Sequence, residues 1–220
     1  MDIETVEWIA SQQPVELGSL DISLDPEDME FLRRHLPQPA VFLNPDNYGT
    51  IHGILHIGRV MANSFVLCKQ LGIDYRPHVI AASLHDIRRI NDRRDAGHGQ
   101  RAAEWFAGQS GRMLSELDAP MAAAVYHGIY YHDVDMQDIP QKILHQHSQA
   151  IQVLKAADAL DRYRQPNLDW WPDKKYIDLS IDPRMPQFCK SMVVVSERLS
   201  LSGTDPNTTV WDALIQLSAA

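Results

Sequence analysis

The chain has 220 residues, of which 45% are hydrophobic and 22% are charged. This composition is that of an ordinary globular chain, which argues against wholesale disorder, and the length suits one domain with a terminal extension. The 20 Lys and Arg residues against 29 Asp and Glu residues give a net charge of −9. Such a charge repels a polyphosphate backbone, so we expect no nucleic-acid polymer as a partner.

The cysteine content and the N-terminal residues indicate the cellular compartment. Only Cys68 and Cys189 are present, too few for a disulfide framework in a chain of this length. The start Met1–Glu4 is acidic and lacks the basic and apolar segments of a secretory signal. No run approaches the roughly 20 apolar residues that span a bilayer. We expect a cytoplasmic protein with reduced thiols and no membrane partner.

The first 48 residues combine several prolines with acidic residues, and predict an extension that packs on the main body. Within them only Pro26–Leu36 has a helical pattern, with Asp25 as its N-cap. From Thr50 onward the apolar spacing is helical, and Gly, Pro, Asp or Asn bounds each segment. Five core helices are expected, at 51–71, 77–87, 98–109, 120–132 and 140–163.

The remaining chain completes the same domain in this interpretation. A loop with paired tryptophans, 165–172, follows the longest helix, and Met185–Leu199 is expected to be helical. Strand-like alternation is nearly absent. The sequence therefore predicts an all-α fold, with a helical-bundle core at 49–164 between the extension 1–48 and a C-terminal loop and helices at 165–220.

Two carboxylates are placed where their helices should be buried. Asp86 follows the apolar run Ile80–Leu84, and Asp158 shares a helix face with Ile151 and Leu154. A buried carboxylate is destabilising by several kcal/mol unless a cation or several donors compensate it. Neither aspartate stands at a helix start, so N-capping does not explain them. Together with inward histidines on separate helices, they predict a divalent metal held by nitrogen and oxygen ligands.

The order His56, then His85-Asp86, then Asp158 resembles the HD superfamily of metal-dependent phosphohydrolases. The flanking residues are also similar to that family's motifs, and the resemblance spans about half the chain. It implies an HD-type helical core in which His56, His85, Asp86 and Asp158 are the metal ligands. The Gly-Tyr-Pro signature of the branch that cleaves cyclic dinucleotides is absent, which disfavours that activity.

Several branches of this family carry further histidines between the pair and the last aspartate, and His98 and His127 occupy comparable places. Asp86 could bridge two ions, because a carboxylate has two oxygens. His132 is five residues after His127 and is expected to project from a different face. We therefore expect one tightly held metal rather than two, with His98 and His127 as catalytic groups facing the phosphate, and Asp86 also orienting the attacking water.

Histidine–carboxylate sites with open positions suit Mn, Fe, Co or Ni, and the sequence leaves Mg and Zn open. The spacing of His52 and His56 is that of a metalloprotease zinc helix, but Gly53 stands where that chemistry needs a glutamate, which disfavours a protease. For His52 two interpretations stay open, a place beside the ligands or in the pocket, and a place in the core.

Arginines predict the type of substrate. Arg59 follows His56 closely, and Arg88 and Arg89 begin a loop directly after His85-Asp86. In an acidic protein such a local cluster favours a small phosphorylated substrate, and we assign these three arginines to substrate binding. The tryptophans Trp170 and Trp171 could stack a base or close a core.

The sequence thus predicts a metal-dependent phosphohydrolase that acts on a nucleotide or another small phosphorylated metabolite. Two alternatives stay open. One is an HD-fold di-iron oxygenase, and the other is a catalytically silent nucleotide-binding signalling module, which the intact ligand set disfavours. The sequence does not distinguish monoesters from diesters or decide whether the chain forms a homo-oligomer.

Overall fold

The computed structural model describes residues 1–12, 20, 22–109, 117–172 and 177–218. Parts of the predicted extension and of the predicted C-terminal segment, namely 13–19, 21, 173–176 and 219–220, lie outside the described residues. Helices dominate and no strand occurs in the described ranges, which confirms the predicted all-α class. None of the helices described is long and apolar enough to cross a membrane.

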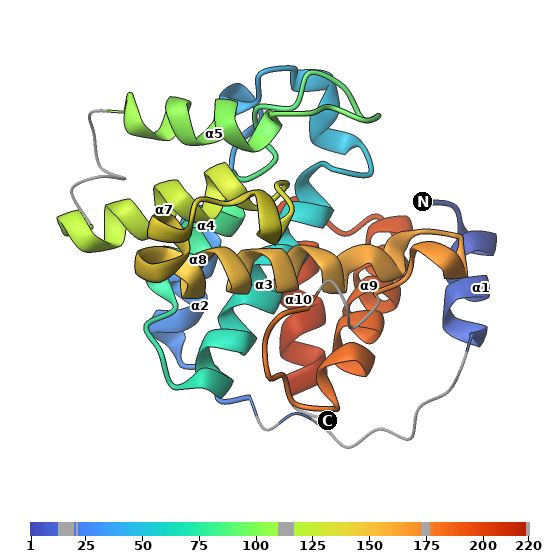
Figure 1. The fold of residues 1–220 in the computed structure, drawn as a ribbon. Helices are drawn as coiled ribbons and strands as arrows, with labels where there is room; N and C mark the ends of the chain where they lie inside the picture. Colours follow the sequence, from blue (N-terminus) through green and yellow to red (C-terminus); the bar gives the residue numbers. More distant parts are fainter. Residues whose placement is uncertain (13–19, 21, 110–116, 173–176, 219–220) are drawn as a thin grey trace.

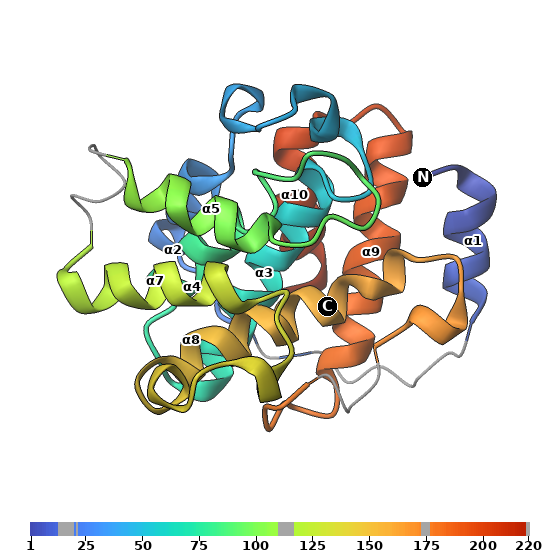
Figure 2. The same cartoon turned by 45° about the horizontal axis from the view of Figure 1, so that its top comes forward.

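The helices form a bundle around α3 (Figures 1 and 2). In chain order they are α1 (Ile3–Ser11), α2 (Pro26–His35), α3 (Ile54–Leu71), α4 (Arg76–Leu84), α5 (His98–Ala107), α7 (Ala119–Tyr131), α8 (Gln141–Leu160), α9 (Met185–Leu201) and α10 (Pro206–Ser218). α3 packs against α4, α8, α9 and α10, while α7 contacts α4, α5 and α8. α1 lies at the edge of the bundle against α9.

All five expected core helices occur, as α3, α4, α5, α7 and α8, and the expected helices after Pro26 and Met185 occur as α2 and α9. α2 begins with a capping box between Asp25 and Asp28. α4 ends at Leu84, earlier than expected, so His85 and Asp86 lie in the turn that follows it. α8 passes at its C-terminal end into a 3₁₀ turn, η4 (Asp161–Arg164).

The sequence did not predict α1. Asp2 caps its first turn by accepting a hydrogen bond from the Thr5 N–H at 2.8 Å. Its apolar residues Val6 and Ile9 are buried in a small cluster with Val193 and Val194 of α9. An isolated helix of nine residues is marginal in water. Contact with α9 therefore stabilises α1, and a local sequence pattern does not reveal that contact.

α3 is buried on nearly every side because its neighbours enclose it. Its apolar residues, Ile57 and Phe65 among them, belong to the main core. The polar side chains of His56, Arg59 and Asn63 are buried with them, each at 1% exposure. Buried polar groups require hydrogen-bond partners, so the partners of these three side chains come from the surrounding helices.

Gly53 fixes the point at which α3 begins. A Cβ at this position would lie 2.1 Å from the Tyr48 carbonyl oxygen and 2.6 Å from that of Asn47. Both oxygens belong to a 3₁₀ turn, η2 (Pro45–Gly49), and backbone atoms cannot give way as a flexible side chain can. Only glycine fits here. Because His56 lies three residues later on α3, the position of Gly53 also helps to position His56.

We predict that Gly53→Ala lowers the free energy of unfolding by about 2 kcal/mol, because overpacking against a fixed backbone strains the fold. Gly49→Ala is the matched control, since a Cβ there meets nothing within 4 Å. Urea unfolding followed by circular dichroism measures both. Equal stability of the two variants would contradict the tight packing assigned to Gly53.

Candidate metal centre

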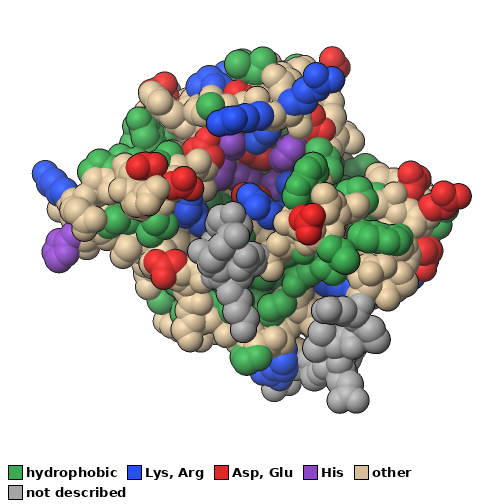
Figure 3. Space-filling model, turned by 45° about the vertical axis from the view of Figure 1, so that its right-hand side comes forward, with side chains coloured by type: hydrophobic (Ala, Val, Ile, Leu, Met, Phe, Trp, Pro, Cys, Tyr) green, Lys and Arg blue, Asp and Glu red, His purple; other side chains and the backbone are tan. Residues whose placement is uncertain are grey.

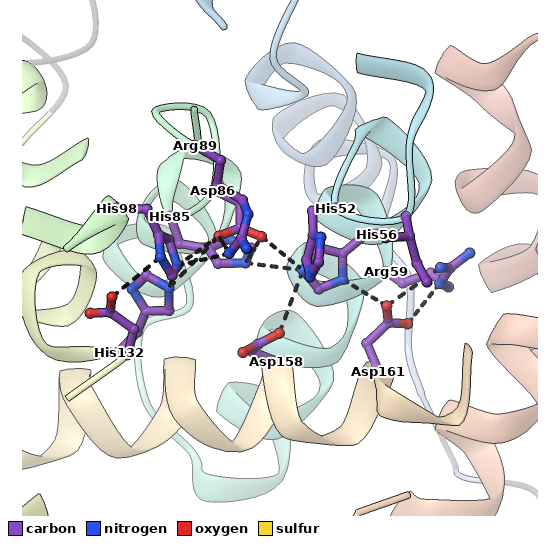
Figure 4. A network of polar contacts seen from close by, with 12 residues as sticks. His52, His56, Arg59, His85, Asp86, Arg89, His98, His132, Asp158 and Asp161 are labelled. Carbon is purple, nitrogen blue, oxygen red and sulfur yellow. Dashed lines mark hydrogen bonds and ion pairs between the residues drawn. The ribbon is translucent and has the colours of Figure 1, made fainter. Parts of the chain in front are cut away.

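Histidines and aspartates from five separate helices converge at one point in the bundle (Figure 4). Helix interiors supply two of these side chains, and helix ends or the turns after them supply the others. They are His56 on α3, His85 and Asp86 after α4, His98 at the start of α5, His132 after α7, and Asp158 on α8.

The Asp86 carboxylate lies between two pairs of imidazoles. Its Oδ2 is 3.5 Å from Nε2 of His56 and 3.8 Å from Nε2 of His85. Its Oδ1 is 3.0 Å from Nε2 of His98 and 3.9 Å from Nε2 of His132. Asp86 is only 3% exposed, so little of this carboxylate is open to water.

Asp158 completes the first pair from the α8 side. Its Oδ1 is 3.5 Å from Nε2 of His56, and its side chain is 27% exposed. Two sets of potential ligand atoms are compact, because within each set all the atoms lie within 4.8 Å of one another. One set comes from His56, His85 and Asp158, and the other comes from His85, Asp86 and His132. These groups could hold a metal ion.

The second ring nitrogen of each histidine determines which nitrogen faces this centre. Nδ1 of His85 lies 2.7 Å from the Ala82 carbonyl oxygen, and the rings of His98 and His132 make equivalent 2.7 Å bonds to backbone carbonyls. A carbonyl oxygen only accepts, so Nδ1 carries the proton in these rings. Nδ1 of His56 bonds to the Asp161 carboxylate at 2.7 Å. In the neutral imidazoles, Nε2 is therefore the ligand atom.

The facing nitrogens test whether a cation fits. Nε2 of His56 is 3.2 Å from Nε2 of His85, and Nε2 of His98 is 2.9 Å from Nε2 of His132. Two lone pairs at such distances repel each other unless a proton or a metal ion lies between them. The oriented Nδ1 bonds and the nearby carboxylates are the usual surroundings of metal-binding histidines, so the residues fit a metal ion.

Electrostatics keep the two aspartates ionised. Burial opposes the charge on Asp86, but the adjacent His85 and the facing imidazoles of His56 and His98 hold its pKa well below the usual range. Burial likewise opposes the charge on Asp158, and His56, His85 and Arg164 outweigh it and lower its pKa. Burial also lowers the pKa of His85 to about 3, so this ring is neutral at pH 7. Anionic carboxylates and a neutral imidazole are the forms that bind metal.

Arg59 does not reach this centre as a substrate group. Its Nε donates to Asp161 at 2.7 Å and its Nη1 to Glu197 at 2.8 Å, so the guanidinium is held in a buried ion pair. Asp161 in turn bonds to His56 and is 3.3 Å from Arg164. The expected substrate-binding role is thus replaced by a structural one, in which Arg59 neutralises the carboxylate that orients His56.

A cavity of about 870 Å³ opens over the ligands. Figure 3 shows histidines inside a hollow edged by both basic and acidic side chains. Arg89 lines the cavity, with its Nη1 3.4 Å from Asp86 Oδ1. Arg88 is not part of the lining, because it points to the Val41 carbonyl and lies over the Trp105 ring. Of the three arginines expected to bind substrate, only Arg89 reaches this cavity.

His127 is not brought to the cluster. Its ring stacks on His147 with 4.2 Å between the ring centroids, and it does not line the cavity. His132 occupies the place expected for His127: its backbone angles are still helical, it projects from a different face than His127, and that face meets the cluster. One signal was available in the sequence: His132-Asp133 repeats the pair His85-Asp86, and Asp133 lies 3.3 Å from Nδ1 of His98.

Comparison with known proteins gives no match, whether with protein-family models, curated proteins or solved structures. The chemistry of the centre has to be inferred from its own residues.

We predict that Arg59→Met lowers the free energy of unfolding by about 3–5 kcal/mol, because it leaves Asp161 and Glu197 buried without their cation. Arg88→Met is the control and should lose about 1 kcal/mol at most, since Arg88 makes only a carbonyl and a ring contact. Denaturant unfolding measures both. A small effect at Arg59 would show that its ion pair does not hold the structure together.

Proposed function

We propose that the chain is a metal-dependent phosphohydrolase of the HD type, acting on a nucleotide or another small phosphorylated metabolite. The observation that carries this proposal is the Asp86 carboxylate between two imidazole pairs at the floor of an open cavity. The order His56, His85-Asp86, Asp158 supports it, because it resembles the motif order of that superfamily.

The ligand set favours two ions over the single ion expected from the sequence. One ion would be held by His56, His85, Asp86 and Asp158, and a second by Asp86, His98 and His132. A set of nitrogen and oxygen ligands without sulfur suits Mn, Fe, Co or Ni. When bound, such ions polarise a phosphoryl oxygen and lower the pKa of a water molecule, so that hydroxide forms near neutral pH.

Fixed cations in the cavity wall support an anionic substrate. Arg89, Lys155 and Arg164 all line the cavity. Lys155 donates to the carbonyls of His132 and Val134, and Arg164 donates to that of Ile51, so both charges are held in place. These groups would bind and orient the phosphate oxygens over the centre.

His52 and Asp92 would move the proton. Nδ1 of His52 lies 2.6 Å from Asp92, which also accepts from the Thr50 hydroxyl and from backbone N–H groups. His52 lines the cavity, so Nε2 is the nitrogen left for substrate. Burial and the neighbouring His56 lower the pKa of His52, so Nε2 begins neutral. It would accept a proton from solvent in the cavity and pass it to the leaving oxygen, while Asp92 stabilises the imidazolium.

A di-iron oxygenase is the second candidate, because four imidazoles and a bridging carboxylate also suit a pair of irons. The two candidates differ in what they consume. Oxygen uptake without phosphate release would favour the oxygenase, whereas phosphate release under argon would favour the hydrolase.

We predict two metal ions per chain and phosphate release from nucleotides. His132→Ala should reduce the metal content to one ion and turnover by roughly a hundredfold or more, because it removes a ligand of the second ion. His127→Ala is the matched control, from the same part of the chain but outside the cluster, and should change neither. Elemental analysis and a phosphate assay measure both quantities. Metal loss in the His127 variant, or full metal content in the His132 variant, would contradict the assigned ligands.

We further predict that His52→Gln reduces turnover of an alkyl phosphate by roughly a hundredfold but that of p-nitrophenyl phosphate much less, because only the alkoxide needs a proton to leave. Asp92→Asn should show the same selectivity, and metal content should stay unchanged in both variants. An equal loss on the two substrates would argue against proton delivery by His52.

A further inference from the structure

The adjacent tryptophans after α8 lie in different surroundings. Trp171 belongs to the packed interior, since its Nε1–H donates to the Gln165 carbonyl at 2.9 Å and its ring edges contact Trp8 and Tyr163. Trp170 is 58% exposed, and its ring packs on no other ring within the described residues. Trp170 nonetheless lines the cavity over the metal centre. A large apolar side chain left exposed inside a concave site indicates a ligand contact.

The backbone holds Trp170 in place without help from its ring. It ends a 3₁₀ turn, η5 (Leu168–Trp170), in which the Asn167 side chain accepts from the Asp169 N–H and the Asn167 carbonyl accepts from the Trp170 N–H. After the turn, the hydrogen bond from Trp171 to the Gln165 carbonyl anchors the chain. The backbone that carries the indole is thus held at the cavity, which reduces the entropy lost when a ligand binds.

Trp170 differs in chemical character from the other side chains that line the cavity. Apart from the histidines, Trp170 is the only aromatic side chain among the described residues that line this cavity. The other side chains are mainly charged or amide groups, with the cations Arg162 and Arg164 on the same stretch of chain. A cavity of about 870 Å³ also exceeds what a phosphate group alone would fill.

We propose that Trp170 is a stacking platform that selects phosphate esters carrying a nucleobase over those carrying only a sugar. The ring offers a π-face to the base while the basic groups and the metal centre take the phosphate. The inference rests on the proposed function for the position of the phosphate. Trp170 itself determines specificity and takes no part in the chemical step.

The test compares two ligands that differ only in the base. These are the methylene-phosphonate analogues of adenosine 5′-monophosphate and ribose 5-phosphate, in which the bridging ester oxygen is CH₂ and hydrolysis is blocked. Calorimetric titration of the full chain with Mn²⁺ present should show about tenfold or greater preference for the adenosine analogue. Trp170→Leu should abolish that preference and leave affinity for the ribose analogue unchanged, whereas Trp170→Phe should retain part of it.

Leu168→Ala is the matched control, because Leu168 is exposed in the same turn but does not line the cavity. It should behave as the parent chain does. Equal affinity of the parent for the two ligands, or an equal loss of both in Trp170→Leu, would overturn the stacking platform. Base preference that depends on Trp170 without phosphate release from nucleotides would support the platform and refute the proposed hydrolysis.

Discussion

The buried charge of Asp86 is the constraint on which the rest of the centre depends. A carboxylate at 3% exposure is tolerated only where neighbouring groups replace water, and here four imidazoles surround it. Each imidazole is in turn held by a hydrogen bond at Nδ1, three of them to backbone carbonyls near helix ends. The carbonyls at the helix ends therefore orient the imidazole rings. The packing of the helices in the bundle brings these ends together.

The imidazoles of His98 and His132 can meet only if the start of α5 lies very close to the end of α7. A Cβ on Gly99 would lie 2.7 Å from the Ile129 carbonyl oxygen and 2.8 Å from Nδ1 of His132. Glycine at the residue after His98 thus lets the start of α5 approach the end of α7. Without that approach, His98 and His132 would not meet beside Oδ1 of Asp86.

Much of the fold follows from local sequence patterns. Apolar spacing and the bounding Gly and Pro residues predicted α3, α4, α5, α7 and α8, since each has an extended buried face and local end signals. α1 was not predicted, because its few apolar residues gain stability only from α9. The conflict between burial and charge at Asp86 and Asp158 is visible in the sequence and predicts a centre at these residues.

What the sequence could not supply are contacts across long separations, which decide what each helix face meets. Arg59 has the same charge whether it meets a substrate or a carboxylate, and only the fold shows that Asp161, 102 residues later, is its partner. His132 keeps helical backbone angles at the end of α7 and, as expected, projects from a different face than His127, but the sequence did not show that this face meets the cluster. His127, inside the helix, obeys the periodicity and therefore faces His147 on α8 instead.

The ion pair of Arg59 with Asp161 and Glu197 also bears on how the chain folds. Its members are separated by 102 and 138 residues, so it forms only when α3, η4 and α9 are all docked. A partly assembled version would leave a desolvated charge without its partner, which is costly. We therefore expect its stabilisation to arrive after the main folding barrier, and to slow unfolding rather than speed folding. Such a network would lengthen the lifetime of the native bundle, a kinetic property separate from its equilibrium stability.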